Sequence, residues 1–323
     1  MPDILVTTVP FGEIDPTPIK LIADLDITYE IVTSKAVLSE EEARSRLQGV
    51  KYLIAGTERL SVDTLSYCSD LKLISRVGIG LDSVDLLAAK KLGISVAYTP
   101  DGPTGAVVEL TIGLMLDQMR RISNTDAELR RGLWHRTMGP RLHDTTFGII
   151  GAGRIGSGVI NLLIKMGAKR VVYYDIDKQI GLESNPVVSR VDLESLLTDS
   201  DIVSLHLPLS TNTRHFISTD ELSKMKQNAS IINTSRGGIV DEEALREALN
   251  NKRIKSAAID VFQNEPYRGP LTLCRNCTLT AHMGSMSFDC RAKMEIEATE
   301  NVIKFIKGEK DYGQIPETEY QNI

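Results

Sequence analysis

The chain has 323 residues, of which 42% are hydrophobic, and its formal net charge at pH 7 is −6. This length and hydrophobic content suffice for two domains with separate cores. The mild, evenly distributed charge excludes a basic surface for nucleic acid or for an anionic membrane. No apolar run reaches the roughly 18 residues of a membrane span. The N-terminus lacks the features of a secretory signal, so we expect a cytoplasmic protein.

The four cysteines are too few for a disulfide scaffold in a chain of this length. Cys274 and Cys277 have a spacing found in metal sites, but Cys68 and Cys290 form no second pair of that kind. We therefore expect no metal, and interpret Cys274 and Cys277 as part of a loop that leads into a strand. The sequence assigns these two thiols no role.

The first hundred residues alternate short apolar runs with amphipathic segments, which predicts a parallel sheet with helices on both faces. The expected strands lie at residues 4–6, 29–32, 52–54, 71–74 and 94–97. Val77, Gly78, Ile79 and Gly80 follow the fourth of these strands, and backbone N–H groups at such a position can bind a small carboxylate. An ordinary strand-to-helix turn is the alternative interpretation.

An unusually apolar segment, residues 106–122, follows Pro103. A helix that is apolar on nearly every side should be buried on every side, so we expect it between domains or in a subunit interface. A more polar second helix is expected over residues 125–134.

A glycine-rich turn lies near the middle of the chain. The buried strand predicted at 146–150 leads into Gly151-x-Gly153-x-x-Gly156 and then into an apolar helix. In that context the first glycine permits a tight turn, the second lets the backbone approach a pyrophosphate, and the third lets the helix pack against the strand. The sequence therefore predicts a dinucleotide site.

The next predicted strand, 170–174, ends at Asp175. An acid at this distance from the glycines accepts hydrogen bonds from the ribose hydroxyls of an adenosine. Because a carboxylate repels a 2′-phosphate, Asp175 favours NAD over NADP.

The alternation of strands and helices continues through the second half of the chain and predicts a second doubly wound sheet, of Rossmann type. The expected strands lie at 202–205, 230–233, 256–260 and 278–281, and the expected helices at 218–225 and 241–250. A long amphipathic segment, 288–307, is expected to return to the first unit, and residues 311–323 to form a loosely held tail. The expected domains are 1–99 plus 288–323, and 100–287.

Three residues with complementary chemistry follow successive predicted strands: Arg236, Glu265 and His282. The carboxyl ends of parallel strands share one edge of a sheet, so these side chains can converge. Arg236 can hold a carboxylate and polarise the adjacent carbonyl. His282 can exchange a proton with that carbonyl's oxygen, and Glu265 can orient its ring. This combination predicts hydride transfer on a 2-oxo acid.

These motifs resemble the D-isomer-specific 2-hydroxyacid dehydrogenase family, and most of all its phosphoglycerate dehydrogenase-like members without a regulatory domain. The matching stretches are 76–85, 109–116, 148–156, 206–210, 232–242, 258–266 and 281–284. The resemblance implies an α/β fold with a flavodoxin-like substrate domain and a Rossmann NAD-binding domain. It also implies a homodimer formed through the nucleotide domain.

The resemblance implies roles for individual residues. The catalytic residues would be Arg236, Glu265 and His282. The NAD-binding residues would be Gly151, Gly153, Arg154, Ile155, Gly156, Asp175, His206, Pro208, Thr234, Ser235, Asp260, Gly284 and Ser285. The substrate carboxylate would meet Val77, Gly78, Ile79, Gly80 and Arg236.

Two features leave the substrate open. Many relatives have other residues where this chain has Pro103 and Met283, and the loop after the third predicted strand offers a phosphate only Arg59, with Arg76 further on. The implied activity is therefore NAD-dependent interconversion of a small D-2-hydroxy acid and its 2-oxo acid, with 3-phosphoglycerate as one candidate. The alternatives are an NAD-sensing protein that resembles a corepressor, and a phosphite dehydrogenase. Glu265 disfavours formate, since the formate enzymes place Gln beside the His.

Overall fold

The computed structural model describes residues 1–33, 38–100 and 102–321 of the chain. These residues form two compact units. Unit 1 consists of Met1–Pro103 and Ser285–Ile323, and unit 2 of Thr104–Gly284. The boundaries expected from the sequence, 99/100 and 287/288, lie three or four residues away from these.

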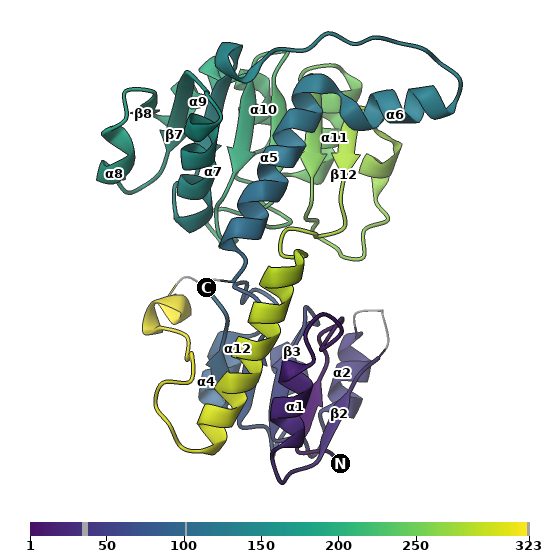
Figure 1. The fold of residues 1–323 in the computed structure, drawn as a ribbon, viewed down its shortest axis with the longest axis vertical. Coiled ribbons are helices and arrows are strands. Elements are labelled where there is room, and N and C mark those ends of the chain that lie inside the picture. Colours follow the sequence, from purple (N-terminus) through teal and green to yellow (C-terminus); the bar gives the residue numbers. More distant parts are fainter. Residues whose placement is uncertain (34–37, 101, 322–323) are drawn as a thin grey trace. The chain divides into compact units, whose positions relative to one another are not determined.

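Unit 1 contains a five-stranded parallel sheet (Figure 1). Its strands are β1 (Ile4–Val6), β2 (Tyr29–Ile31), β3 (Tyr52–Ala55), β4 (Leu73–Arg76) and β5 (Ser95–Ala97), in the order β2-β1-β3-β4-β5. This is the flavodoxin-like order, in which the strand order reverses between β1 and β3. The helices α1 (Thr17–Ala23) and α12 (Phe288–Ile306) pack together, and α3 (Val62–Ser66) packs against both α2 (Glu40–Arg46) and α4 (Leu86–Lys91).

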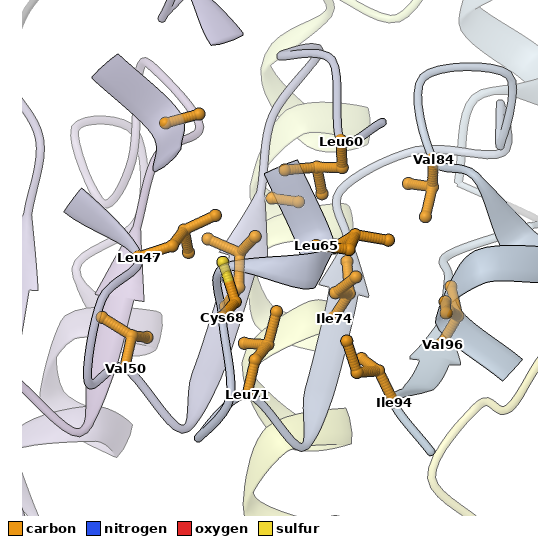
Figure 2. Packing of buried hydrophobic residues seen from close by; sticks show 14 of the residues in the cluster. Leu47, Val50, Leu60, Leu65, Cys68, Leu71, Ile74, Val84, Ile94 and Val96 are labelled. Carbon is orange, nitrogen blue, oxygen red and sulfur yellow. The ribbon is translucent and has the colours of Figure 1, made fainter. Parts of the chain in front are cut away.

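The core of unit 1 explains why these short elements are stable together (Figure 2). Leu47, Leu65 and Ile74 are among the residues that are fully buried in it. Cys68 lies in the same cluster, and burial raises the pKa of its thiol to about 11. This thiol is therefore a packing group at neutral pH.

Unit 2 contains a seven-stranded parallel sheet (Figure 1). Its strands are β6 (Thr146–Ile150), β7 (Arg170–Tyr174), β8 (Val188–Arg190), β9 (Ile202–Leu205), β10 (Ser230–Asn233), β11 (Ser256–Ile259) and β12 (Cys277–Leu279), in the order β12-β11-β10-β9-β6-β7-β8. The strand order reverses between β6 and β9, which is the topological switch point of a Rossmann sheet. The predicted fold class, two doubly wound parallel sheets, is confirmed.

Helices cover both faces of the unit 2 sheet. The helices α5 (Thr104–Arg120) and α7 (Arg154–Lys165) pack side by side on one face, and α9 (Leu193–Asp199), α10 (Thr219–Lys224) and α11 (Glu242–Asn250) form a row on the other. A short helix, α8 (Ile180–Glu183), accompanies β8. Phe147 and Ile149 of β6 join one core cluster and Ile150 joins the other. The central strand is therefore buried on both sides, as parallel sheets require.

Both helices expected after Pro103 are present. The apolar helix, α5, buries its side chains within unit 2 itself, against α7, β10 and β11, while Glu109 and Gly113 stay exposed. The second helix, α6, spans Ile122–Arg130, not 125–134, because the chain turns at Gly132 with a φ of +80°. No helix of the described residues has the length and apolar character needed to cross a membrane.

The prediction of a loosely held tail was wrong for the described residues up to 321. Tyr98 donates a backbone hydrogen bond to Gly313 at 3.2 Å, and Ile315 donates one to Val96 at 3.1 Å. Gln314 thereby pairs with Ala97 in an antiparallel bridge beside β5. Ile315 is only 3% exposed, so one apolar side chain anchors a segment whose composition is otherwise polar.

Candidate active site

Three neighbouring strands of unit 2 end in register. Asn233 of β10 lies opposite Ile259 of β11, which lies opposite Leu279 of β12. Arg236, Glu265 and His282 each follow one of these strand ends within a few residues. All three therefore emerge at the carboxyl edge of the same sheet, the edge at which open α/β sheets bind ligands.

The structure brings His282 and Glu265 into direct contact. Nδ1 of His282 lies 2.8 Å from Oε2 of Glu265, and both side chains are about one-third exposed, at 38% and 30%. Because the carboxylate can only accept, Nδ1 carries a proton and Nε2 is left for a ligand. The other oxygen of Glu265 accepts the backbone N–H of Phe262 at 2.9 Å, which fixes the carboxylate.

Asp260 orders the loop that carries His282. The backbone carbonyl of Asp260 accepts the N–H of His282 at 2.8 Å. Its carboxylate accepts the N–H groups of Met283 and Gly284, at 2.8 and 3.0 Å. Three successive N–H groups thus converge on one residue, and His282 takes a left-handed φ of 51° to permit this. Such a backbone conformation is costly for a residue other than glycine, and it is typical of functional sites.

The family resemblance implied that Asp260 binds NAD. In the structure Asp260 is fully buried, and its two carboxylate oxygens are used by Met283, Gly284 and the hydroxyl of Thr280. Its observed role is therefore to shape the loop 280–284. Sequence reasoning missed this role, because an Asp near a strand end has no signal that separates a ligand contact from a loop contact.

The turn that carries Arg236 packs against the turn that precedes Glu265. A Cβ atom at Gly237 would lie 1.9 Å from the carbonyl oxygen of Phe262, so only glycine fits there. Asn233 donates to the carbonyl of Arg236 at 2.9 Å, and Nη1 of Arg236 donates to the carbonyl of Ser235 at 2.6 Å. The backbones of the two turns are thus in direct contact at Gly237 and Phe262.

A second connection between these two turns comes from His215, to which the sequence analysis gives no role. Nε2 of His215 lies 2.8 Å from Nε2 of Gln263, and the backbone N–H of His215 donates to the carbonyl of Gly238 at 2.7 Å. The N–H of Gln263 in turn donates to Glu242 at 2.7 Å. His215 thereby joins the segment after Arg236 to the segment before Glu265.

The glycine turn after β6 has the form of a phosphate cradle. Gly151 has a φ of +87°, and a Cβ atom at Gly156 would lie 1.9 Å from the carbonyl oxygen of Gly151. Apart from its chain neighbours and its own helix, no described residue has an atom within 4 Å of a Cβ atom at Gly153, and none of them caps the first turn of α7 with a side chain. The open space and the uncapped helix N-terminus fit the pyrophosphate of a dinucleotide.

Asp175 is attached to this cradle. Its Oδ2 accepts the N–H of Ala152 at 2.6 Å, and its Oδ1 accepts the N–H of Asp177 at 3.0 Å. The half-buried carboxylate is therefore fixed at the end of β7, beside the glycine turn. This position suits an acceptor for the ribose hydroxyls.

His206 lies at the switch point between β6 and β9. Its N–H donates to the carbonyl of Ile150 at 2.8 Å, and its own carbonyl oxygen would lie 2.6 Å from a Cβ atom at Gly151. Nε2 of the ring lies 3.0 Å from Oγ of Ser204. Nδ1 is buried and has no hydrogen-bond partner among the described residues. An unpaired polar atom beside the glycine turn is consistent with a ligand site.

The remaining residues expected to bind NAD take different positions. Thr234 and Ser235 are buried, and their hydroxyls are bonded within unit 2, to Thr111 at 2.8 Å and to Asn233 at 2.7 Å. On the glycine turn and the segment after β9, Arg154 and Pro208 are exposed, and Ile155 is partly buried. Gly284 is buried beside Asp260, whereas Ser285 is partly buried and belongs to unit 1.

The expected substrate-binding backbone lies in unit 1, at the carboxyl end of β4. The N–H of Val77 donates to the carbonyl of Ala55 at 3.0 Å, and the N–H of Gly78 donates to the Thr99 hydroxyl at 2.8 Å. Within the part of the chain that the structure describes, the N–H groups of Ile79 and Gly80 take part in no hydrogen bond. Of the four residues expected to bind the substrate, Val77 and Gly78 therefore already use their N–H groups within unit 1.

The two closely spaced cysteines show no feature of a metal centre. Burial raises the pKa of both the Cys274 and the Cys277 thiols, which opposes metal binding by a thiolate. Among the residues described, no group of three or more His, Cys, Asp or Glu side chains could hold a metal ion.

We predict that Asp260→Asn loosens the His282 loop. An amide has one acceptor oxygen, so the N–H of either Met283 or Gly284 would lose its partner, at a cost of about 1–3 kcal/mol. Amide hydrogen exchange of a peptide covering 280–286 should then accelerate at least about fivefold. Thr280→Val, which removes only the hydroxyl contact to Asp260, is the matched control and should accelerate exchange less. Equal exchange in wild type and Asp260→Asn would contradict this role.

A second prediction concerns acid stability. Burial lowers the pKa of His206 to about 3, below its ordinary value of 6.5. As the pH falls below 6.5, the unfolded chain gains a proton at His206 that the folded chain does not, so stability is lost between pH 6.5 and 3. Between pH 7 and 5, the unfolding free energy of wild type should fall by about 2 kcal/mol more than that of His206→Gln. Urea unfolding at both pH values measures this difference, and parallel losses would rule the effect out.

Comparison with known proteins identifies the family. The sequence profile of the D-isomer specific 2-hydroxyacid dehydrogenase NAD binding domain matches residues 112–284. The chain is 39% identical over 262 residues to a glyoxylate reductase from Thermofilum pendens, covering 78% of this chain and 77% of that protein. It is 37% identical over 279 residues to a D-3-phosphoglycerate dehydrogenase from Methanocaldococcus jannaschii, covering 84% of this chain but only 53% of that longer protein.

A solved structure agrees with these matches. The crystal structure of D-lactate dehydrogenase from Aquifex aeolicus, complexed with NAD and lactic acid, superposes with a TM-score of 0.85 at 26% identity, covering 97% of this chain and 98% of that one. Sequence, fold and the fit of the glycine turn to a dinucleotide lead to one conclusion. The chain belongs to the D-isomer specific 2-hydroxyacid dehydrogenase family, and it is an NAD-dependent oxidoreductase.

Proposed function

We propose that this protein reduces glyoxylate and similarly small, unphosphorylated 2-oxo acids with NADH, and that it also catalyses the reverse oxidation. The observation that carries the proposal is the 2.8 Å contact between His282 and Glu265. This pair lies at the carboxyl edge of the sheet that also carries the glycine turn. The similarity to a glyoxylate reductase supports the choice of substrate.

His282 supplies the proton in this scheme. With Nδ1 bonded to Glu265, Nε2 is the ring atom that can reach a substrate. In reduction, protonated Nε2 gives its proton to the carbonyl oxygen as that oxygen gains charge. In oxidation, unprotonated Nε2 removes the proton from the hydroxyl group. Glu265 keeps the ring in one orientation.

Arg236 holds the acid. Its guanidinium can grip a carboxylate through two parallel N–H groups and polarise the neighbouring carbonyl. The close packing of Gly237 on Phe262 fixes the backbone from which this side chain extends. NADH, when bound on the glycine turn and Asp175, supplies the hydride that reduces the carbonyl carbon.

The region after β3 in unit 1 argues against a phosphorylated substrate. Arg59 is 76% exposed and pairs with Glu40 at 3.1 Å, and buried Arg76 donates from Nη1 to the carbonyl of Val77. Glu58 is 3% exposed and accepts hydrogen bonds from the Thr7 hydroxyl and, at 3.3 Å, from the N–H of Gly56. An acidic residue therefore takes the backbone donor at the switch point of this sheet, where an anionic ligand would need it.

The test compares substrates that differ only in a phosphate. We expect NADH oxidation with glyoxylate and with hydroxypyruvate, and a kcat/KM at least about 100-fold lower with phosphohydroxypyruvate, because Arg59 and Arg76 already have partners. His282→Asn should lower kcat by about 10²- to 10⁴-fold. The matched control is His143→Asn, since His143 is an exposed histidine outside the site that pairs with Asp144.

Each contrary result indicates another function. A preference for phosphohydroxypyruvate would make the protein a phosphoglycerate dehydrogenase. NAD binding without turnover of any 2-oxo acid would favour the corepressor-like alternative. Oxidation of phosphite, with no reaction of 2-oxo acids, would favour the phosphite dehydrogenase alternative.

We further infer that the protein is a homodimer, formed through α6 and the connector that follows it. This segment, residues 121–140, is called the arm. No residue of α6 is buried, and in Figure 1 the helix extends beyond the sheet of unit 2. The arm carries five exposed apolar side chains: Ile122, Leu129, Leu133, Trp134 and Met138. An apolar surface of this kind is typical of a protein interface.

Trp134→Glu should therefore convert the dimer to a monomer. Trp134 is 78% exposed in the single chain, and a buried charge in an apolar interface is strongly unfavourable. Size-exclusion chromatography with light scattering should give twice the chain mass for wild type and one chain mass for the variant. Leu273→Glu, at an 83% exposed apolar residue outside the arm, is the control and should remain dimeric. A monomeric wild type would refute the interface.

A further inference from the structure

We propose that Arg190 can bind the 2′-phosphate of NADP, and that the negative charge of Asp175 prevents this. The preference for NAD over NADP would then depend on the charge of Asp175. The two residues lie at the ends of adjacent parallel strands, because β7 ends one residue before Asp175 and β8 ends at Arg190. Tyr173 of β7 lies opposite Arg190 in the register of the sheet. Both residues therefore lie at the carboxyl edge, where the adenosine ribose is expected.

Arg190 contacts the backbone of the residue that selects the cofactor. Its Nη2 donates to the carbonyl oxygens of Asp175 and Ile176, at 2.8 and 3.1 Å. Nε and Nη1 make no hydrogen bond to the described residues, and the residue is exposed. A guanidinium with unused donors thus lies against the segment that carries the ribose-binding carboxylate. Such planar donors are well suited to phosphate.

Asp175 opposes this cation. Its carboxylate is held by the N–H groups of Ala152 and Asp177, so it cannot easily turn away from a ligand on the glycine turn. A 2′-phosphate would bring about two negative charges to this fixed carboxylate. The same carboxylate attracts the uncharged ribose hydroxyls of NAD. The discrimination against NADP therefore comes from the charge of the Asp175 carboxylate and not from the shape of the binding site.

The other charged groups of the segment do not change this balance. Lys178 is paired with Glu183 at 2.9 Å, and Asp177 is exposed. Ile176 is 84% exposed and presents no charge. Within this segment Arg190 therefore keeps donors that can bind a phosphate, whereas Lys178 is already paired.

A purely structural role for Arg190 makes a different prediction. If Arg190 only holds the Asp175–Ile176 backbone, its loss should weaken the binding of NADH and NADPH by the same factor. If Arg190 binds the 2′-phosphate once the carboxylate is gone, its loss should weaken NADPH alone. The ratio of the two dissociation constants separates these roles, because effects on the shared part of the two cofactors cancel.

The experiment is a double-mutant cycle on the full chain, with Kd for NADH and NADPH measured by fluorescence titration in the absence of substrate. Asp175→Asn keeps one acceptor oxygen for Ala152 and removes the charge. We expect the ratio Kd(NADPH)/Kd(NADH) to fall at least about tenfold in Asp175→Asn. In Asp175→Asn with Arg190→Gln, the ratio should return at least most of the way to that of wild type. Lys178→Gln in the Asp175→Asn background is the matched control and should leave the ratio unchanged.

Two results would overturn the proposal: an unchanged ratio in Asp175→Asn, or a ratio in the double variant equal to that of Asp175→Asn. NADH binding itself reports that each variant is folded. Because the readout is equilibrium binding without turnover, it is independent of which 2-oxo acid the enzyme reduces. A wrong substrate assignment would leave this result intact.

Discussion

The hydrogen bonds between Asp260 and the N–H groups of residues 282–284 are the constraint on which the candidate site depends. Three donors from successive residues meet one backbone carbonyl and one buried carboxylate. This arrangement stabilises a left-handed backbone at His282 that a non-glycine residue otherwise avoids. The direction of the His282 side chain, and with it the contact to Glu265, follows from that backbone. If His282 is the proton donor, as proposed, its ring is oriented before any substrate arrives, which is the condition for efficient acid–base catalysis.

The same site is also stabilised by the contact between the turn that carries Arg236 and the turn that precedes Glu265. Gly237 touches the backbone of Phe262 so closely that no side chain fits between them. His215 and Gln263 then join the two turns at a second point. Arg236 and Glu265 therefore extend from a single packed backbone unit although almost thirty residues lie between them. Rigid backbone beneath exposed polar side chains permits a polar, solvent-accessible site without loss of geometry.

The sequence predicted the fold class and most of the strands, because parallel strands buried on both faces have a strong apolar signal. It also predicted that Arg236, Glu265 and His282 share an edge, since that follows from strand order alone. The role of Asp260 was not accessible, because the partners of a buried carboxylate depend on tertiary contacts. The anchored tail was missed for a related reason: Ile315 is a single apolar residue, and only its packing beside β5 distinguishes it from a loop residue.

The glycine turn shows how a sequence fingerprint combines two kinds of requirement. Gly151 and Gly156 are explained by the chain itself, through a positive φ and through a contact that a Cβ atom would make impossible. Gly153 has no such explanation, because a Cβ atom there would meet only open space. A glycine that the fold does not require is best explained by a ligand that passes close to the backbone. Two of the three glycines therefore report on the Rossmann fold, and the third reports on the dinucleotide.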